Sequence, residues 1–389
     1  MAKTKHKRTK TARLTLIAFA FVSIVIIVLM SHLSEVDERG SARPPFEEIY
    51  TPSRQLLSCI SLIDRSISDG LNKMGVPREK ILFLSTQPVY KNDFQWDFST
   101  IEVTIPHHYD IFRVGKEFRD YMANLRIPVQ IAVNKKSRNE IIYSVYCKGF
   151  YTHRVTLTRD SPHVFDRVSS PKIAIIIDDL GYDCAFASAF LAIDLSLTLS
   201  VLPFTPHTRS IARKSNKEGR EIMLHLPMEP RSYPALNPGD GVLLVSMDKD
   251  MILDILDKDI GDVPFVDGVN NHMGSKFTEN EEKMMIVLTE LKRRGLYFID
   301  SKTSPNSVAF NLAKKMEIRA ASRDIFLDND LSESALTIQM DRLLALAKHR
   351  GHAIGIAHPH KETLGILQKY QPILSNEAEV VPVSALLNY

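Results

Sequence analysis

Two adjacent carboxylates follow a short run of apolar residues near the middle of the chain. The run is 173–177, and the carboxylates are Asp178 and Asp179. A short apolar run without alternation is typical of a strand buried on both faces of a parallel sheet. Because consecutive side chains of a strand point to opposite faces, one Asp can hold a metal ion while the other accepts a proton. In the alternative, one Asp caps the next helix and the other is solvated.

Further polar side chains stand at the ends of later predicted strands. They are His225, Glu229, Asn271, His272, Asp300, Arg323, Asp328, His358 and His360. Taken singly, each has an ordinary explanation, such as a hydrogen-bonded His in the core or an Arg in a surface ion pair. At one rim, a carboxylate and two imidazoles form a ligand set suited to Zn²⁺, which lowers the pKa of bound water. A second carboxylate can take the proton from that water, and a further His can protonate a leaving group.

Strands and helices alternate from residue 172 onward, and this alternation must bring those side chains together. The predicted strands are 173–177, 197–202, 221–226, 265–269, 296–299, 325–327, 353–357 and 380–383, and the predicted helices include 208–218, 249–260, 280–294, 307–316 and 332–350. The pattern predicts an α/β fold with a parallel sheet, in the form of a closed or partly closed (β/α) barrel. A doubly wound open sheet is the alternative. No Gly-rich phosphate loop follows any predicted strand, which argues against nucleotide binding.

The first part of the chain predicts a membrane attachment. Residues 1–13 are a basic tail without acidic residues, and residues 14–33 are an apolar stretch long enough to cross a bilayer. Basic residues before this stretch and acidic ones after it favour a cytoplasmic N-terminus. We therefore expect a single-pass signal anchor in the inner (cytoplasmic) membrane, with the body on the periplasmic side. A cleaved signal peptide is the alternative.

Between the anchor and the α/β region, the sequence predicts a second folded unit. Residues 34–50 resemble a tether, residues 51–160 a small α+β domain, and residues 161–171 a linker before the domain at 172–389. The predicted elements of the small domain are helices at 53–73 and 110–125 and strands at 81–84, 95–105, 129–133 and 140–158. It contains no active-site pattern. We interpret it as an interaction or spacer module whose partner would be an envelope protein.

Charge and cysteine content narrow the function classes. The 389 residues carry a formal net charge of +3, and residues 1–13 alone carry +6, so the remainder is mildly acidic. General affinity for nucleic acid is therefore not expected. The chain has three widely spaced cysteines, Cys59, Cys147 and Cys184, and no CxxC motif. An oxidising compartment permits one disulfide, for which Cys59 and Cys147 are preferred because both precede the linker; three buried thiols are the alternative.

The motif series from residue 172 to about residue 387 resembles that of the divergent polysaccharide deacetylases, relatives of the NodB-type deacetylases. The segments that carry the resemblance are 177–179, 224–229, 270–275, 298–301, 323–328 and 354–359, in that order. The resemblance implies a distorted (β/α) barrel of NodB-like type. It further implies Asp178 as the catalytic base, Asp179 and His272 as metal ligands, and His358 as the catalytic acid.

The sequence departs from the NodB-type pattern in two places. Lys276 stands where the second His of the His-(Ser/Thr)-x-x-His motif is expected, so His225 is the first choice for the third ligand and His360 the second. The Arg-Pro-Pro-Tyr motif has no clear counterpart, and Arg323 or Asp300 is expected in similar space. The residues expected around the substrate or behind the ligands are Glu229, Asn271, Asp300, Arg323, Asp328 and His360.

Residues and resemblance together imply a membrane-anchored, metal-dependent deacetylase, a hydrolase of linear amide C–N bonds. The expected cofactor is a divalent metal, Zn²⁺, and the expected substrate is an N-acetylated envelope polysaccharide or peptidoglycan-type sugar. The alternative is a catalytically silent barrel that binds metal or glycan and acts as an envelope scaffold or regulator. A glycoside hydrolase would need two carboxylates across a cleft, such as Asp178 with Asp300 or Glu229, and would leave the histidines unexplained.

Overall fold

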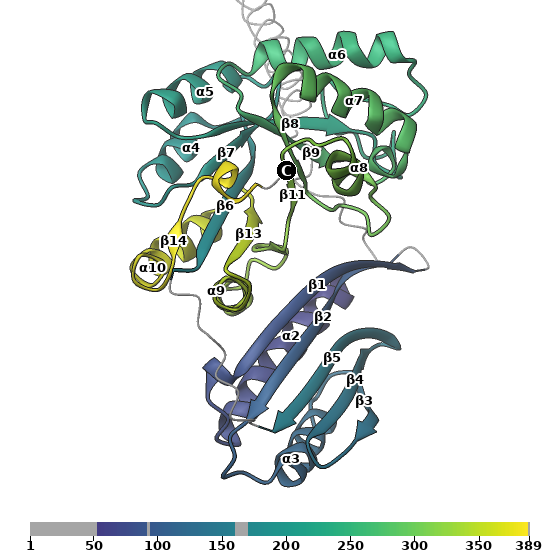
Figure 1. Cartoon of the computed structure of the whole chain (residues 1–389), viewed down its shortest axis with the longest axis vertical. Helices are drawn as coiled ribbons and strands as arrows, with labels where there is room; N and C mark the ends of the chain where they lie inside the picture. The colour runs from purple at the N-terminus through teal and green to yellow at the C-terminus, as the bar shows by residue number, and fades with distance from the viewer. Residues whose placement is uncertain (1–52, 92–93, 160–169, 388–389) are drawn as a thin grey trace, which may run out of the picture. The chain divides into compact units, whose positions relative to one another are not determined.

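The structure is a computed structural model that describes residues 53–91, 94–159 and 170–387. The predicted basic tail, membrane anchor and tether lie outside these residues, as does the predicted linker except for residues 170 and 171. No helix in the described part of the chain is long and apolar enough to span a bilayer. The described chain forms two β-sheets, and each sheet packs in a hydrophobic core of its own (Figure 1).

The first sheet belongs to an α+β module, which we define as residues 53–159. Its elements are α2 (Ser53–Lys73), η1 (Arg78–Lys80), β1 (Ile81–Lys91), β2 (Phe94–Ile105), α3 (Ile111–Ala123), β3 (Val129–Lys136), β4 (Glu140–Cys147) and β5 (Phe150–Arg159). The strand order is β1-β2-β5-β4-β3, with β2 and β5 parallel and the other neighbours antiparallel. Helix α2 buries Leu56, Ile63 and Ile67 against this sheet at helical spacing, and each stabilises the fold by about 2 kcal/mol.

Two features of the module bear on the sequence predictions. Cys59 of α2 and Cys147 of β4 form a disulfide, as preferred from their position before the linker, and Cys184 is a free thiol. The prediction of one strand over 140–158 was wrong, because β4 and β5 form a hairpin. Lys148 and Gly149 both have positive φ, 49° and 82°, which is the geometry of a tight two-residue hairpin turn.

The second sheet forms a partly closed (β/α) barrel, which we define as residues 171–387. Its strands are β6 (Lys172–Leu180), β7 (Thr198–Val201), β8 (Ile222–Met228), β9 (Gly268–Met273), β10 (Tyr297–Asp300), β11 (Ala320–Ser322), β12 (Ile325–Phe326), β13 (His352–Ala357) and β14 (Glu379–Val380). Its helices are α4 (Cys184–Leu191), α5 (Thr208–Lys217), α6 (Lys249–Asp262), α7 (Glu281–Arg294), α8 (Ala309–Lys315), α9 (Glu333–Arg350) and α10 (Lys361–Glu377), with η2 (Phe277–Glu279) and η3 (Val383–Leu386). All of its ladders are parallel, as the alternation of strands and helices predicts.

The sheet curls until its two edges meet at one segment of chain. The strand order is β11-β10-β9-β8-β7-β6-β13-β12, with β14 beside the start of β6. Residues 320–322 pair with β10, and residues 325–326 pair with β13. Only two residues separate these pairings, so a single segment bridges both edges. The structure therefore agrees with a partly closed barrel and not with a doubly wound open sheet.

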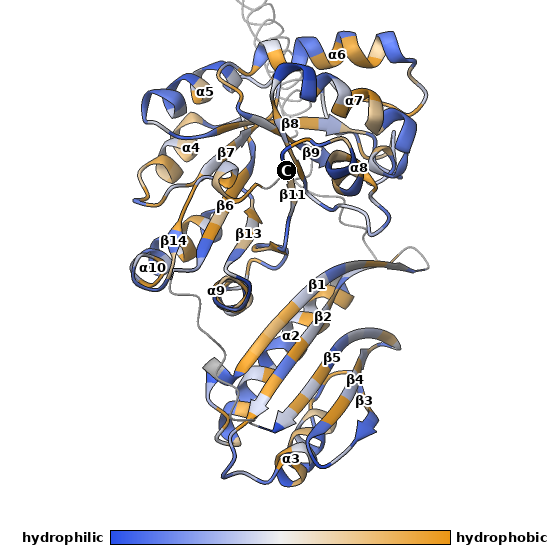
Figure 2. Cartoon of the chain, in the orientation of Figure 1, coloured by the Kyte–Doolittle hydropathy of each residue, from blue (hydrophilic) through white to orange (hydrophobic). Residues whose placement is uncertain are grey.

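The two faces of the curled sheet bury different sets of apolar residues. Ile173, Ile175 and Ile177 pack in the core that includes the surrounding helices, whereas Ala174 and Ile176 pack with Val383 and Leu386 inside the curl. Figure 2 shows α6 alternating between hydrophobic and hydrophilic residues, and its buried Ile252 and Leu256 pack in the core that includes the helices. Strand β6 is therefore buried on both faces, as its uninterrupted apolar run predicts.

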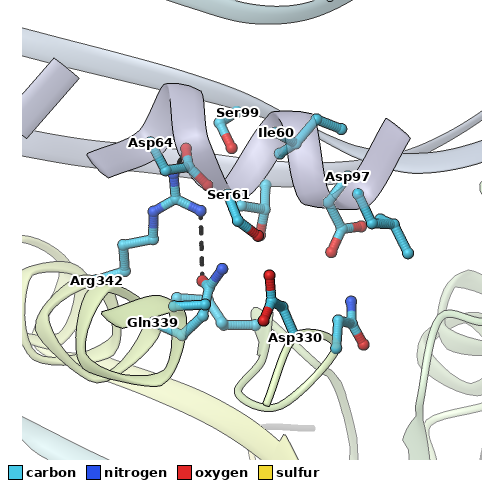
Figure 3. Close-up of a pocket in the computed structure, with 13 residues that line it drawn as sticks. Ile60, Ser61, Asp64, Asp97, Ser99, Asp330, Gln339 and Arg342 are labelled. Atoms are coloured by element: carbon cyan, nitrogen blue, oxygen red, sulfur yellow. Dashed lines mark hydrogen bonds and ion pairs between the residues drawn. The ribbon is translucent and has the colours of Figure 1, made fainter. Parts of the chain in front are cut away.

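Buried polar contacts join the module to the barrel. Asp64 of α2 forms an ion pair with Arg342 of α9 and lies 2.7 Å from His153 Nε2. Burial works to raise the pKa of Asp64, but the charges of Arg342 and His153 outweigh burial and lower it. The pair lines a cavity together with Ser99 and Asp330 (Figure 3). The cavity has a volume of about 30 Å³, which has room for one or two water molecules.

We expect the buried carboxyl of Asp259 to make barrel stability depend on pH. Asp259 lies on α6 with neither oxygen hydrogen-bonded, and burial together with the charge of Asp262 raises its pKa to about 8. Between about pH 4 and pH 8 the folded state holds a proton that the unfolded chain releases, so stability falls as pH rises. We expect Asp259→Asn to show a smaller loss of Tm between pH 5 and pH 8 than the wild type, with a higher Tm at pH 8.

The matched control for this prediction is Asp254→Asn, which makes the same change at an exposed position of the same helix. Thermal unfolding followed by circular dichroism at both pH values measures the effect. If Asp259→Asn and the wild type lose the same Tm between pH 5 and pH 8, Asp259 does not hold its proton in the folded state.

Candidate metal centre and active site

Asp178 and Asp179 lie where the pairing of β6 with β7 is interrupted. The register shifts between Ile177 and Leu180, and Asp179 has a φ of 54°, a left-handed conformation that is uncommon outside glycine. A bulge of this kind re-aims side chains. The expectation that the two carboxylates point to opposite faces was therefore wrong. Both approach one ring, because His225 Nε2 lies 2.8 Å from Asp179 Oδ1 and 3.8 Å from Asp178 Oδ2.

One carboxylate from β6 and two imidazoles, one from the middle of β8 and one from near the end of β9, converge. Asp179 Oδ1 lies 2.8 Å from His225 Nε2 and 2.9 Å from His272 Nδ1, and the two ring nitrogens are 3.1 Å apart. Each of the three side chains is buried. They form the one group of His, Cys, Asp or Glu side chains arranged to hold a metal ion among the residues that the structure describes. His225, the first choice for the third ligand, belongs to this group, and His360 does not.

The geometry within this cluster suits a cation. Neither oxygen of Asp179 has a partner in hydrogen-bond geometry, although two ring nitrogens lie close to it, and His272 Nε2 has none either. A buried carboxylate without donors destabilises the folded state, and a divalent ion between the three ligand atoms would remove that cost. Two imidazoles and a carboxylate are also the protein ligands of a known type of catalytic zinc site that keeps one position open. The residues present therefore fit a divalent metal.

Burial and mutual charge move the pKa values of the two carboxyls in opposite directions. At Asp179 burial works to raise the pKa, but the charges of His272 and His225 outweigh burial and hold it far below its usual range. At Asp178 burial dominates and raises the pKa, opposed by His225 and His358. Carboxyl groups whose pKa values are pushed apart in this way suit two separate roles. The pattern fits Asp179 as a ligand and Asp178 as a base.

The two rings of the cluster also differ in pKa. Burial lowers the pKa of His272, whereas at His225 the charges of Asp178 and Asp179 overcome burial and raise the pKa. Two ring nitrogens 3.1 Å apart cannot both carry a hydrogen on the line between them. The shifts differ in direction because the charges of the two carboxylates outweigh burial at His225 but not at His272.

His358 is oriented by a carboxylate from the segment after β12. Asp328 Oδ1 lies 2.9 Å from His358 Nδ1, and Asp328 Oδ2 accepts bonds from the His358 backbone N–H and from Thr363 Oγ1. Because Nδ1 donates to Asp328, Nε2 is the nitrogen at which this ring takes up or releases a proton. The charge of His358 acts on the pKa of Asp178, so the two groups interact across the site. His360 lies beside His358, with ring centroids 6.4 Å apart.

Glu229 and Lys276 form an ion pair at the rim of the barrel. Glu229 Oε1 lies 2.5 Å from Lys276 Nζ, and Oε2 accepts a hydrogen bond from the backbone N–H of Val245. Lys276 stands where the NodB-type pattern has its second His. It is not part of the metal cluster, in which His225 supplies the second ring.

Asn271, Asp300 and Arg323 hold the turns that follow β9 and β10. Asn271 Oδ1 accepts a bond from the Ser301 N–H at 2.9 Å, and Asp300 Oδ1 accepts one from the Lys302 N–H at 2.8 Å. Arg323 Nε donates to the Ser301 carbonyl at 2.8 Å. These bonds shape the loops around the site.

Asn270 is a site residue that sequence reasoning missed. Its Nδ2 donates to both oxygens of Asp178, at 2.8 and 3.0 Å, and its Oδ1 lies 2.9 Å from His225 Nδ1. The predicted base is therefore held by an amide that was not among the predicted site residues. Asn270 stands two residues before His272 on β9, so the two share a strand face, and this spacing was the available signal.

Removal of either imidazole should weaken metal binding sharply. We expect His225→Ala and His272→Ala each to lower the zinc affinity of the purified chain by at least about 100-fold. Removing a residue that only supports a metal ligand lowers metal affinity by about 10- to 100-fold, and removing the ligand itself should lower it further. Competition titration with a chelator of known affinity measures the change. His360→Ala is the control and should retain wild-type affinity. Wild-type affinity in both test variants would mean that the cluster is not a metal centre.

Comparisons with known proteins identify the family of the chain. A family model described as divergent polysaccharide deacetylase matches residues 175–387. The uncharacterized protein YibQ of Escherichia coli (strain K12) is 37% identical over 225 residues, which cover 57% of this chain and 70% of that protein. An uncharacterized protein of Haemophilus influenzae is 32% identical over 215 residues, which cover 55% of this chain and 76% of that protein.

One solved structure is also similar. An uncharacterized protein from Agrobacterium tumefaciens C58 matches with a TM-score of 0.54 and 26% identity, over 58% of this chain and 92% of that one. The family match extends from within β6 to the end of the described barrel and includes every residue of the metal cluster. Because it spans more than half of the sequence, this chain belongs to the divergent polysaccharide deacetylase family.

Proposed function

We propose that this chain is a metal-dependent deacetylase of N-acetylated envelope glycans. The observation that carries the proposal is the separation of roles between two adjacent carboxyls. Asp179 faces two imidazoles, whereas Asp178 is held by the Asn270 amide and has a raised pKa. A metal ligand beside a base is what hydrolysis of an amide at a metal centre requires. Membership of the deacetylase family supports the substrate class.

In this proposal Asp179, His225 and His272 hold a divalent ion, and Zn²⁺ suits that donor set. When bound, the ion supplies Lewis acidity, which lowers the pKa of water and stabilises negative charge on the acetyl carbonyl oxygen. Asp178 accepts the proton of the attacking water, and burial, which raises its pKa, makes it a stronger base.

His358 completes the reaction as the acid. The C–N bond breaks as His358 Nε2 gives a proton to the departing sugar amine, and acetate is the other product. Asp328 at Nδ1 supports this role because a carboxylate there stabilises the positive charge of the protonated ring. Glu229, Asn271, Asp300 and Arg323 shape the rim that would receive the sugar, with His360 next to the acid.

We further propose that the body lies outside the cytoplasm, anchored by residues 14–33. The order of basic, apolar and acidic residues at the N-terminus supports this orientation. The disulfide between Cys59 and Cys147 supports it independently, since such bonds persist in oxidising compartments. In this arrangement the α+β module would serve as the spacer or as the docking unit for an envelope protein.

The decisive variant for this function is Asp178→Asn. We expect zinc-loaded wild-type protein to release acetate from N-acetylated chitooligosaccharides or peptidoglycan fragments, and Asp178→Asn to lower the rate by at least about 100-fold through loss of the general base. An enzyme-coupled acetate assay measures the rate. Asp254→Asn, the same change at an exposed position of α6, should leave it unchanged.

The alternative function, binding without turnover, gives a different result in the same assay. A silent barrel would release no acetate from any of these substrates, and its affinity for zinc or glycan would survive Asp178→Asn. That combination of results would favour a scaffold or regulator over an enzyme as the function of this chain.

A further inference from the structure

Asn270 uses the whole hydrogen-bonding capacity of its amide inside the barrel. The residue is fully buried. Its Oδ1 lies 2.6 Å from Ser200 Oγ and 2.9 Å from His225 Nδ1, and its Nδ2 lies within 3.2 Å of both Asp178 oxygens and Ser301 Oγ. These neighbours come from β6, β7, β8 and the turn after β10. One amide therefore links both halves of the site, the predicted base and a predicted metal ligand.

The orientation of this amide follows from the chemistry of its neighbours. The carboxylate of Asp178 can only accept hydrogen bonds, so the group that faces both of its oxygens must be the Asn270 NH₂. The opposite orientation would set a carbonyl oxygen against a carboxylate. With Nδ2 on Asp178, the carbonyl oxygen of Asn270 must face His225 Nδ1.

This orientation selects one tautomer of His225. A carbonyl oxygen accepts, so Nδ1 of the ring must carry the hydrogen. The lone pair of the neutral ring is then on Nε2, the atom that lies 2.8 Å from Asp179 Oδ1 and 3.1 Å from His272 Nδ1. Asn270 thus presents the correct nitrogen of His225 to the metal cluster.

We propose that Asn270 is a positioning residue with two separable effects. Through Oδ1 it holds His225 in the tautomer that binds metal, and through Nδ2 it holds the Asp178 carboxylate in place as the base. The inference rests on the proposed function of the site. It goes beyond that function by assigning one side chain to both the metal and the base.

Two substitutions separate these effects. Asn270→Ala removes the acceptor and the donors together. Asn270→Asp keeps the shape and an acceptor oxygen for His225 Nδ1, but it sets a second acceptor against Asp178 in place of the N–H donors. A residue with a purely structural role would not distinguish the two variants in this way.

The experiment measures zinc affinity by chelator competition and acetate release, both with the full chain. We expect Asn270→Ala to lose about 10- to 100-fold in zinc affinity, the usual effect of removing a partner behind a metal ligand. Asn270→Asp should keep wild-type zinc affinity and lose kcat by at least about 10-fold, within the range of a general base. Asn280→Ala, which removes the side-chain N-cap of α7, controls for general destabilisation and should change neither quantity.

A spectroscopic measurement tests the tautomer without turnover. Long-range ¹H–¹⁵N spectra of the histidine-labelled, metal-free chain, recorded at a pH where the His225 ring is neutral, should show its hydrogen on Nδ1 in the wild type and in Asn270→Asp, but not in Asn270→Ala. The inference is overturned if wild-type His225 carries its hydrogen on Nε2, or if Asn270→Ala binds zinc like the wild type. If Asn270→Ala fails to fold, the zinc affinity and kcat of Asn270→Asp and the wild-type spectrum test the inference in its place. Absence of acetate release by the wild type would count against the proposed function alone, because zinc affinity and the tautomer are measured independently.

Discussion

The approach of Asp179 Oδ1 to two buried imidazoles is the contact on which the site depends. A carboxylate removed from water destabilises a fold unless a positive charge lies close to it, and Asp179 Oδ1 has the two ring nitrogens within 2.9 Å and almost no exposed surface. The bulge in β6 makes the contact possible. In a regular strand Asp179 would share the face of Ile175 and Ile177, which pack in the core that includes the helices. The left-handed φ of Asp179 is thus strain placed where it turns a ligand toward its partners.

The polar and charged side chains of the site lie at one end of the barrel sheet. Inside the curl, Val383 and Leu386 of the C-terminal segment pack with Ile176 and Ile356, so this part of the interior is apolar. The charged and polar groups collect at the carboxyl ends of the strands, where parallel architectures place their sites. The segment that bridges the two sheet edges continues into Asp328, the partner of the predicted acid. Closure of the barrel and orientation of the acid therefore depend on the same stretch of chain.

Much of the fold could be predicted because its signals are local. The apolar run of β6 and the helical spacing in α2 report burial directly, and the structure has both elements where they were expected. The hairpin of β4 and β5 was missed because the two strands are separated only by Lys148 and Gly149. Strand β11 was missed because three residues without an apolar run carry no periodic signal. Its strand conformation comes from pairing with β10, which no local pattern records.

The sequence by itself determined which residue types stand at the strand ends, and hence the ligand candidates Asp179, His225 and His272. The carboxyl ends of parallel strands meet at a common sheet edge, so these residues could be expected together. Only the tertiary structure decided that His225, not His360, completes the cluster, and that Asn270 contacts Asp178. Those choices depend on a bulge and on side chains from three separate strands, β6, β8 and β9, meeting within hydrogen-bond distance. Such contacts arise from packing between distant segments, which spacing along one chain does not encode.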